Sequence, residues 1–342
     1  MTATDGIGIV SLAHVLGEPQ DVVETAGTYV DDPERVIRWG YRTYHRAGAD
    51  QTPTRLAADA ARRALDKSGL APADVDYLVV ADSGVPEYLN WDMSASVARE
   101  LGLGTTPSLL VSQGCGSAVT AFQQIAGLIA VRDDIHNVLL VAVNKVSEAH
   151  INRMRNNTCL GSDGGAAAVV RRGHGRLRWL ATEQISDPRY VDFFRIEYGG
   201  SSVPVAPDGT GNLAVDQLGL VHRYFRREPE QLAQFVKDVN HRLATVVEEA
   251  CRRAGVATSQ VRRLIYLNDN QHSMADVARA TGIPLERTNA ELSVGLSHVG
   301  CADQLICLSI YDERQDELGE GDVVALAGLS GGMQWFCTLV RV

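Results

Sequence analysis

Cys115 is the residue of this chain best placed to do chemistry. It lies between Gly114 and Gly116, after an apolar run at residues 108–111 and at the start of a long segment with apolar residues on one helical face. The free N–H groups and positive dipole end of a helix stabilise a thiolate. The pattern therefore indicates a nucleophilic cysteine, with a small buried residue at a strand–helix junction as the alternative.

Two loops in the second half of the chain carry polar residues that such a cysteine could use. One loop begins at Asn268, and the other contains His298, followed at the start of the next helix by Asp303. An imidazole near the sulfur can take a proton from the thiol and then from an alcohol, and a carboxylate can fix its tautomer. Cys115, His298 and Asp303 are thus candidates for an acyl-transfer triad. Structural packing of His298 and helix capping by Asp303 are the alternatives.

The elements that must position these residues alternate between helices and strands. Helix formers fill residues 57–68 and end at Gly69, a suitable helix stop. The apolar runs that predict buried strands are 77–81, 108–111, 138–143 and 166–170. Between them, residues 83–100, 148–163 and 186–229 lack clean periodicity, so we expect loops that shape a substrate channel.

The same order of elements returns in the second half at a fixed distance. Each of three segments recurs 186 positions later: Gly69 at Gly255, Gly114 at Gly300, and Val138 at Val324. A constant offset over separate segments favours an internal duplication over chance likeness. We therefore expect an α/β fold of two pseudo-symmetric βαβαβ-type halves, residues 1–172 and 173–342. In this alignment Cys301 is the counterpart of Cys115, and we expect it to pack rather than react.

Composition excludes several classes of protein. The 342 residues are 45% hydrophobic and 22% charged, which excludes disordered, collagen-like and coiled-coil chains. The net charge is −10 and no Lys/Arg-rich run occurs, so we expect no nucleic-acid partner. The chain begins with no secretory signal, and no apolar run reaches the ~20 residues of a membrane span.

The six cysteines lack the spacing of a disulfide scaffold or a zinc site, and no GxGxxG follows a strand. We expect a cytoplasmic enzyme without a metal or redox cofactor.

Residues 111–122, which surround Cys115, resemble the active-site cysteine segment of the thiolase-fold condensing enzymes, in particular the ketoacyl synthase III group. Four further segments are similar to that group in the same order along the chain: residues 56–82, 161–170, 321–326 and 331–335. The resemblance implies a thiolase-like fold, with the two halves stacked in layers, and a homodimer. It also implies an oxyanion hole formed by the backbone N–H groups of Cys115 and Gly331.

The chain departs from the family pattern at two positions. The decarboxylating members need a His and an Asn at the starts of two loops about 30 positions apart; here Asn268 and His298 occupy those places. The arrangement is similar to the acyltransferase offshoots of the group, which serve polyketide and antibiotic pathways. If the first loop is shifted by four residues, His272 becomes the family histidine instead. We expect the Asn268 amide to assist the oxyanion hole, with a structural role at the strand end as its alternative.

These observations predict a ping-pong acyltransferase. A short acyl group arrives as a coenzyme A or carrier-protein thioester, passes to Cys115, and is taken by the hydroxyl of a small natural-product acceptor. By analogy with the family, Trp39 would stack on the adenine of coenzyme A, and Arg35 or Arg42 would bind phosphate. An amphipathic helix without ligands is the alternative there. The alternative functions are a decarboxylative ketoacyl synthase III and a non-catalytic thiolase-like subunit.

Overall fold

The computed structural model describes residues 6–155, 159–226, 228–314 and 317–342. The strands of its large sheet are β1 (Ile7–Leu16), β4 (Tyr77–Asp82), β5 (Ser108–Val111), β6 (Asn137–Asn144), β7 (Gly164–Arg172), β8 (Arg178–Ser186), β9 (Val261–Ile265), β10 (Val323–Ser330) and β11 (Gln334–Arg341). Their order across the sheet is β5-β4-β6-β7-β1-β8-β11-β10-β9. A separate two-stranded sheet pairs β2 (Glu18–Asp21) with β3 (Thr43–Arg46).

The helices frame this sheet. They are α1 (Val22–Tyr29), α2 (Pro33–Ile37), α3 (Pro53–Ser68), α4 (Met93–Leu101), α5 (Ser117–Val131), α6 (Gln217–Tyr224), α7 (Pro229–Ala254), α8 (Gln271–Thr281), α9 (Ala290–Leu296) and α10 (Asp303–Glu313). Six short 3₁₀ segments complete the described elements: η1 (Pro72–Asp74), η2 (Pro188–Phe194), η3 (Asn212–Ala214), η4 (Thr258–Gln260), η5 (Leu285–Arg287) and η6 (Gly300–Ala302).

The duplication predicted from the sequence is confirmed by strand register. In the first half β4 runs parallel to β6 with Leu78 opposite Leu139, and in the second half β9 runs parallel to β10 with Leu264 opposite Ala325. Both pairings keep the offset of 186 positions. The helix before each of β4 and β9 ends at a glycine in the left-handed region, Gly69 at φ +69° and Gly255 at φ +65°.

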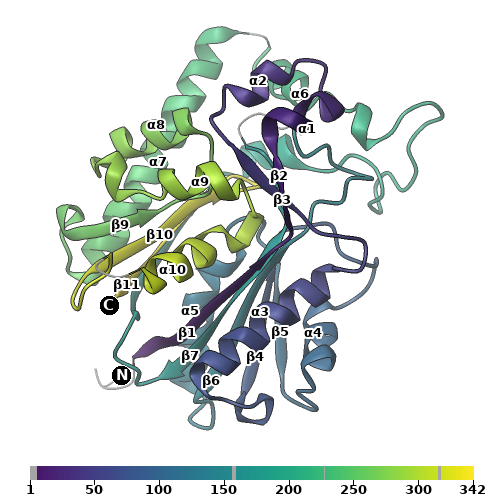
Figure 1. The fold of residues 1–342 in the computed structure, drawn as a ribbon. Coiled ribbons are helices and arrows are strands. Elements are labelled where there is room, and N and C mark those ends of the chain that lie inside the picture. The colour runs from purple at the N-terminus through teal and green to yellow at the C-terminus, as the bar shows by residue number, and fades with distance from the viewer. Residues whose placement is uncertain (1–5, 156–158, 227, 315–316) are drawn as a thin grey trace.

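The halves stack as layers with two equivalent helices between them. α3 and α4 pack on one face of the first five strands, and α7 packs on β8, β10 and β11. α5 and α10 contact strands of both halves, and a single residue pair between β1 and β8 joins the two halves of the sheet (Figure 1). We keep the division at residues 172/173 as a proposal; β7 ends at Arg172 and β8 begins at Arg178.

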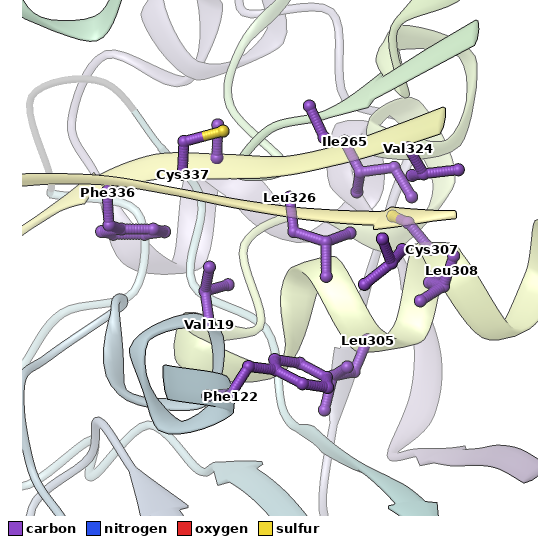
Figure 2. Packing of buried hydrophobic residues seen from close by; sticks show 14 of the residues in the cluster. Val119, Phe122, Ile265, Leu305, Cys307, Leu308, Val324, Leu326, Phe336 and Cys337 are labelled. Carbon is purple, nitrogen blue, oxygen red and sulfur yellow. The ribbon is translucent and has the colours of Figure 1, made fainter. Parts of the chain in front are cut away.

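The largest core lies around these two central helices. Figure 2 shows Phe122 of α5 meeting Leu305 of α10, on the side of β10 that also presents Leu326. Gly114–Val131, which includes α5, is long and apolar enough to cross a membrane by length and composition alone. Half of that stretch is buried inside the protein, as expected for a helix at the centre of a layered core.

The prediction of loops was wrong in two places. Residues 83–100 contain most of α4, which buries Met93, Val97 and Leu101 at a spacing of one helical turn. Asp92 caps this helix by accepting the N–H of Ser94 at 2.8 Å. Residues 186–229 likewise contain α6. Helices this short leave only a weak periodic signal among polar residues. In the remaining predicted loop, residues 148–163, positions 156–158 lie outside the described part of the chain.

Candidate active site

A tight turn places Cys115 at the N-terminus of α5. Gly114 has φ +57°, a conformation that favours glycine, and Gly116 serves as the N-cap. A side chain at Gly116 would put its Cβ 2.8 Å from the ring of Phe336, which is fully buried. The turn thus packs against β11 of the second half. The Cys115 side chain remains partly exposed.

His298 reaches this turn from the second half of the chain. Its Nε2 lies 3.2 Å from Cys115 Sγ. The backbone on both sides is pinned to the first half: His298 N–H donates to Leu160 O and Ser162 N–H donates to His298 O, each at 2.8 Å. His272, the alternative histidine, lies exposed on the first turn of α8. The shifted-loop interpretation is therefore wrong.

Asp303 holds the far side of the imidazole. Its Oδ2 lies 2.6 Å from His298 Nδ1, and the carboxylate is fully buried. Three further donors converge on it: Asn268 N–H at 2.8 Å, the Asn268 amide at 2.9 Å and Val299 N–H at 2.7 Å. Asp303 is the first residue of α10, but its carboxylate accepts none of these bonds from that helix. Helix capping is thus not the use of this side chain.

The charge environment favours the protonated form of the His298 imidazole. Burial by itself would lower the pKa of His298, but the Asp303 carboxylate, with smaller contributions from the thiols of Cys115 and Cys159, outweighs it and holds the pKa well above its usual value. A ring that retains a proton so readily is suited to accept one from a thiol at Nε2. Because Asp303 can only accept, Nδ1 carries the hydrogen in that bond.

The Asn268 side chain supports Asp303. Its amide donates to Asp303 Oδ1 at 2.9 Å, and its own oxygen accepts bonds from Asn289 at 2.9 Å and from the Cys307 thiol at 3.3 Å. A fully buried carboxylate needs donors on both oxygens, and Asn268 supplies one of those on Oδ1. Its contribution to the oxyanion hole remains a prediction.

Gly331 lies in the turn between β10 and β11, against the turn of the nucleophile. Its nitrogen would lie 3.4 Å from a Cβ placed on Gly114, so the backbones of the two turns touch. This proximity is what an oxyanion hole shared by Cys115 and Gly331 requires. The role remains a prediction.

The predicted coenzyme A residues meet different environments. Trp39 is only 8% exposed and packs edge-on against Tyr41 in a small cluster formed with α1 and α2. The Arg35 guanidinium lies over its ring, 5.0 Å from the centroid. A ring buried in this way cannot stack on adenine without rearrangement, so that prediction is wrong for this conformation. Arg42 is exposed, and phosphate binding by an arginine remains a prediction.

Three polar residues near the site carried no local signal in the sequence. Asn289 is fully buried behind Asn268. Burial raises the pKa of Asp269 to about 6, against the opposing effects of the Asn270 N–H and of His298. Burial also raises the pKa of the Cys159 thiol to about 12. Their placement depends on contacts between distant segments. Among the described residues, no group of three His, Cys, Asp or Glu side chains could hold a metal.

Comparisons with known proteins agree with this geometry. Residues 111–188 match the family 3-oxoacyl-[acyl-carrier-protein] synthase III, and residues 251–342 match its C-terminal domain. The synthase III of Synechocystis is 24% identical over 94% of this chain and 91% of its own length. A synthase III of Streptomyces coelicolor is 28% identical over 82% of this chain and 80% of its own length.

Solved structures show the same fold. The acyltransferase ChlB3 superposes with a TM-score of 0.82 at 22% identity, over 98% of both chains. The synthase III of Pseudomonas aeruginosa superposes with a TM-score of 0.79 at 23% identity, also over 98% of both chains. The fold is thus thiolase-like, as expected. Both parts of the ketoacyl synthase III family match in order along the sequence, so the chain is similar to that family around Cys115 and throughout its C-terminal part.

Proposed function

We propose that the protein is an acyltransferase that works through an acyl-cysteine intermediate. The observation that carries this proposal is the contact of His298 with both Cys115 and Asp303. It supplies a nucleophile, a base, and a carboxylate that orients the base.

In the first half-reaction, the Cys115 thiol gives its proton to His298 Nε2 and the sulfur attacks the carbonyl carbon of a thioester donor. The oxyanion is stabilised by the N–H groups of Cys115 and Gly331. Collapse of this intermediate breaks the carbon–sulfur bond of the donor. The departing thiolate takes the proton from His298, and the acyl group stays on Cys115.

In the second half-reaction, the acceptor hydroxyl gives its proton to His298 Nε2 while its oxygen attacks the acyl carbon. Collapse releases the ester, and the Cys115 thiolate regains its proton from His298. Short acyl groups on coenzyme A or a carrier protein are the proposed donors, and a hydroxyl of a small natural product is the proposed acceptor. The similarity to ChlB3, described as an acyltransferase, supports acyl transfer as the reaction.

A decarboxylative synthase is the second candidate, because the curated relatives bear that name over most of their length. In the family pattern such chemistry needs a His and an Asn that both face the thioester carbonyl. Here the amide of Asn268 donates to Asp303, whereas His298 contacts the sulfur. That arrangement favours transfer over carbon–carbon bond formation.

The test is incubation with a panel of acyl-CoA and acyl-carrier donors, followed by peptide mass spectrometry. An adduct on Cys115 that is absent in Cys115→Ala and is discharged by an alcohol acceptor supports transfer. Carbon dioxide release from a malonyl thioester with a β-keto product would establish the synthase instead. A Cys115 that forms no adduct and resists iodoacetamide at neutral pH would indicate a non-catalytic subunit.

The homodimer is part of the proposal. β5 is an edge strand of the large sheet and exposes Leu109 at its centre, and α4 packs beside it. The segment before α4 exposes Tyr88 and Leu89, which are 67% and 77% accessible. Exposed edge strands and apolar patches of this kind call for a partner surface. Light scattering should give twice the chain mass of 36.9 kDa, reduced to one chain by Leu109→Lys; a monomeric native protein would refute the dimer.

A further inference from the structure

A chain of buried side-chain amides extends the site beyond Asp303. Asn289, Asn268 and Asp303 are all fully buried, and they are linked in that order by hydrogen bonds of 2.9 Å. Asn289 immediately precedes α9, and 21 positions separate it from Asn268. The proposed acyl-transfer steps assign Asn289 no role.

The polarity of this chain is fixed at its far end by the backbone. Tyr266 N–H donates to Asn289 Oδ1 at 2.8 Å, and a backbone N–H can only donate. The NH₂ group of Asn289 must then point the other way, where it donates to Tyr266 O at 3.0 Å and to Asn268 Oδ1 at 2.9 Å. Both of its hydrogens are used.

The orientation of the Asn289 amide determines that of the Asn268 amide. With its oxygen turned toward Asn289 and the Cys307 thiol, Asn268 presents its NH₂ group to Asp303 Oδ1. All four bonds to Asp303 then come from donors, two on each oxygen. Each oxygen thus has two donors, and together they fix the carboxylate in place beside His298 Nδ1.

We infer that Asn289 is a positioning residue for the catalytic triad: it holds the Asn268 amide in the one orientation whose NH₂ group keeps the Asp303 carboxylate in place beside His298. The inference rests on the proposed function only in giving Asp303 and His298 a catalytic use. Without Asn289, the Asn268 amide can rotate and turn its oxygen toward Asp303. Two oxygens then face each other and repel, which moves the carboxylate away from its position beside His298 Nδ1.

The test uses the full-length protein and needs neither donor nor acceptor. The rate of Cys115 alkylation by iodoacetamide is measured from pH 5 to 9, with the modified peptide identified by mass spectrometry. In Asn289→Leu, the Asp303 carboxylate should lose its close contact with His298 Nδ1, so it supports the His298 imidazolium less. The acid limb of the profile moves to higher pH, and the rate at pH 7 falls on the order of tenfold, the usual scale for loss of an outer-shell partner.

Gln304→Leu is the matched control. Gln304 is a fully buried amide next to Asp303 in the chain, but it donates to Ala327 O in β10. It should cost stability without moving the acid limb. A double-mutant cycle with Asn268→Leu completes the design: if Asn289 acts through Asn268, the second substitution adds little to the shift produced by the first.

Asn289→Ser, a smaller change, covers the case in which Asn289→Leu fails to fold, and it should give a smaller shift of the same sign. An unmoved acid limb in the folded Asn289 variants, or fully additive shifts with Asn268→Leu, would overturn the inference. This result is distinct from failure of the proposed function. If the profile shifts but the protein transfers no acyl group, the positioning role stands and the proposed function fails. If the protein transfers an acyl group but the profile does not shift, the proposed function stands and the positioning role fails.

Discussion

His298 Nε2 lies 3.2 Å from Cys115 Sγ, although 183 positions separate the two residues. Each lies just before one of the two equivalent central helices: α5 starts at Ser117 and α10 at Asp303, 186 positions later. The duplicated fold thus brings the starts of its two central helices together, one carrying a thiol and the other an imidazole with its carboxylate. The proposed catalytic pair thus forms where the two halves pack.

Replacement of Asp303 by Asn should slow acyl transfer strongly, although the protein should still fold. The amide would lose the charge that supports the His298 imidazolium, and its NH₂ group would face one of the existing donors. By the precedent of Asp-to-Asn changes in catalytic triads, we expect the transfer rate to fall on the order of 10⁴-fold. Single-turnover acylation measures this directly. A loss below tenfold in a folded Asp303→Asn protein would mean that the carboxylate serves only structure.

The stability of the protein should depend on pH through His298. Asp303 raises the pKa of the folded His298 above the usual 6.5, against the effect of burial, so its contribution to stability is complete below pH 6.5 and is lost as the pH rises through the folded pKa. As the pH rises above 6.5 toward the folded pKa, the free energy of unfolding should fall, by at most about 1.4 kcal/mol per pH unit for this one proton.

Comparison with His298→Gln separates His298 from the other titrating groups. Burial raises the pKa of the Cys159 thiol to about 12 and raises the pKa values of the Cys251, Cys301, Cys307 and Cys337 thiols, so these cysteines also lower the stability of both proteins toward alkaline pH. Burial lowers the pKa values of His14, His45 and His174, so their contributions are already complete above pH 7. Asp269, whose pKa is about 6, is ionised in both states there. Urea unfolding at several pH values should show a steeper decline in the native protein than in His298→Gln. An equal slope in both proteins would contradict the assignment.

Chemical constraints made part of the site predictable from the sequence. A cysteine at a helix start, flanked by glycines, and a His–Asp pair five positions apart have few common structural uses, and the structure brings Cys115, His298 and Asp303 together. The directions of Asn268 and Trp39 were not predictable in this way. The first depends on Asn289, 21 positions away, and the second on packing against Tyr41 and Arg35. Such contacts follow from tertiary packing, which local spacing does not encode.

Gly116 and Gly127 form a matched pair for testing the Cys115 turn. Gly116 caps the N-terminus of α5, and Gly127 lies in the interior of the same helix. A Cβ on Gly116 would meet the buried Phe336 ring, whereas a Cβ on Gly127 would meet nothing within 4 Å. Gly116→Ala should cost about 1–3 kcal/mol of stability through overpacking and slow acylation of Cys115. Gly127→Ala should gain up to about 1 kcal/mol from helix propensity and leave acylation unchanged. Equal effects of both changes on acylation would show that the turn tolerates displacement.

Ser297 stores backbone strain immediately before His298. It adopts φ +54° and ψ −176°, a region that almost only glycine occupies, and its hydroxyl donates to Thr43 O at 2.9 Å in β3 of the first half. The hydroxyl therefore anchors the strained residue across the interface between the halves. Ser297→Ala keeps the strain and loses the anchor, so it should cost about 1 kcal/mol of stability and slow alkylation of Cys115.

Ser297→Gly loses the same anchor but relieves the strain, which is worth about 1–3 kcal/mol, so its stability should equal or exceed that of the native protein. Its alkylation rate should still fall, because the His298 loop is then free to move away from the sulfur. Denaturant unfolding and iodoacetamide kinetics on the two variants separate these effects. If Ser297→Gly proves less stable than Ser297→Ala, the backbone at this position is not strained. If both variants react at the native rate, the anchor to Thr43 does not position His298.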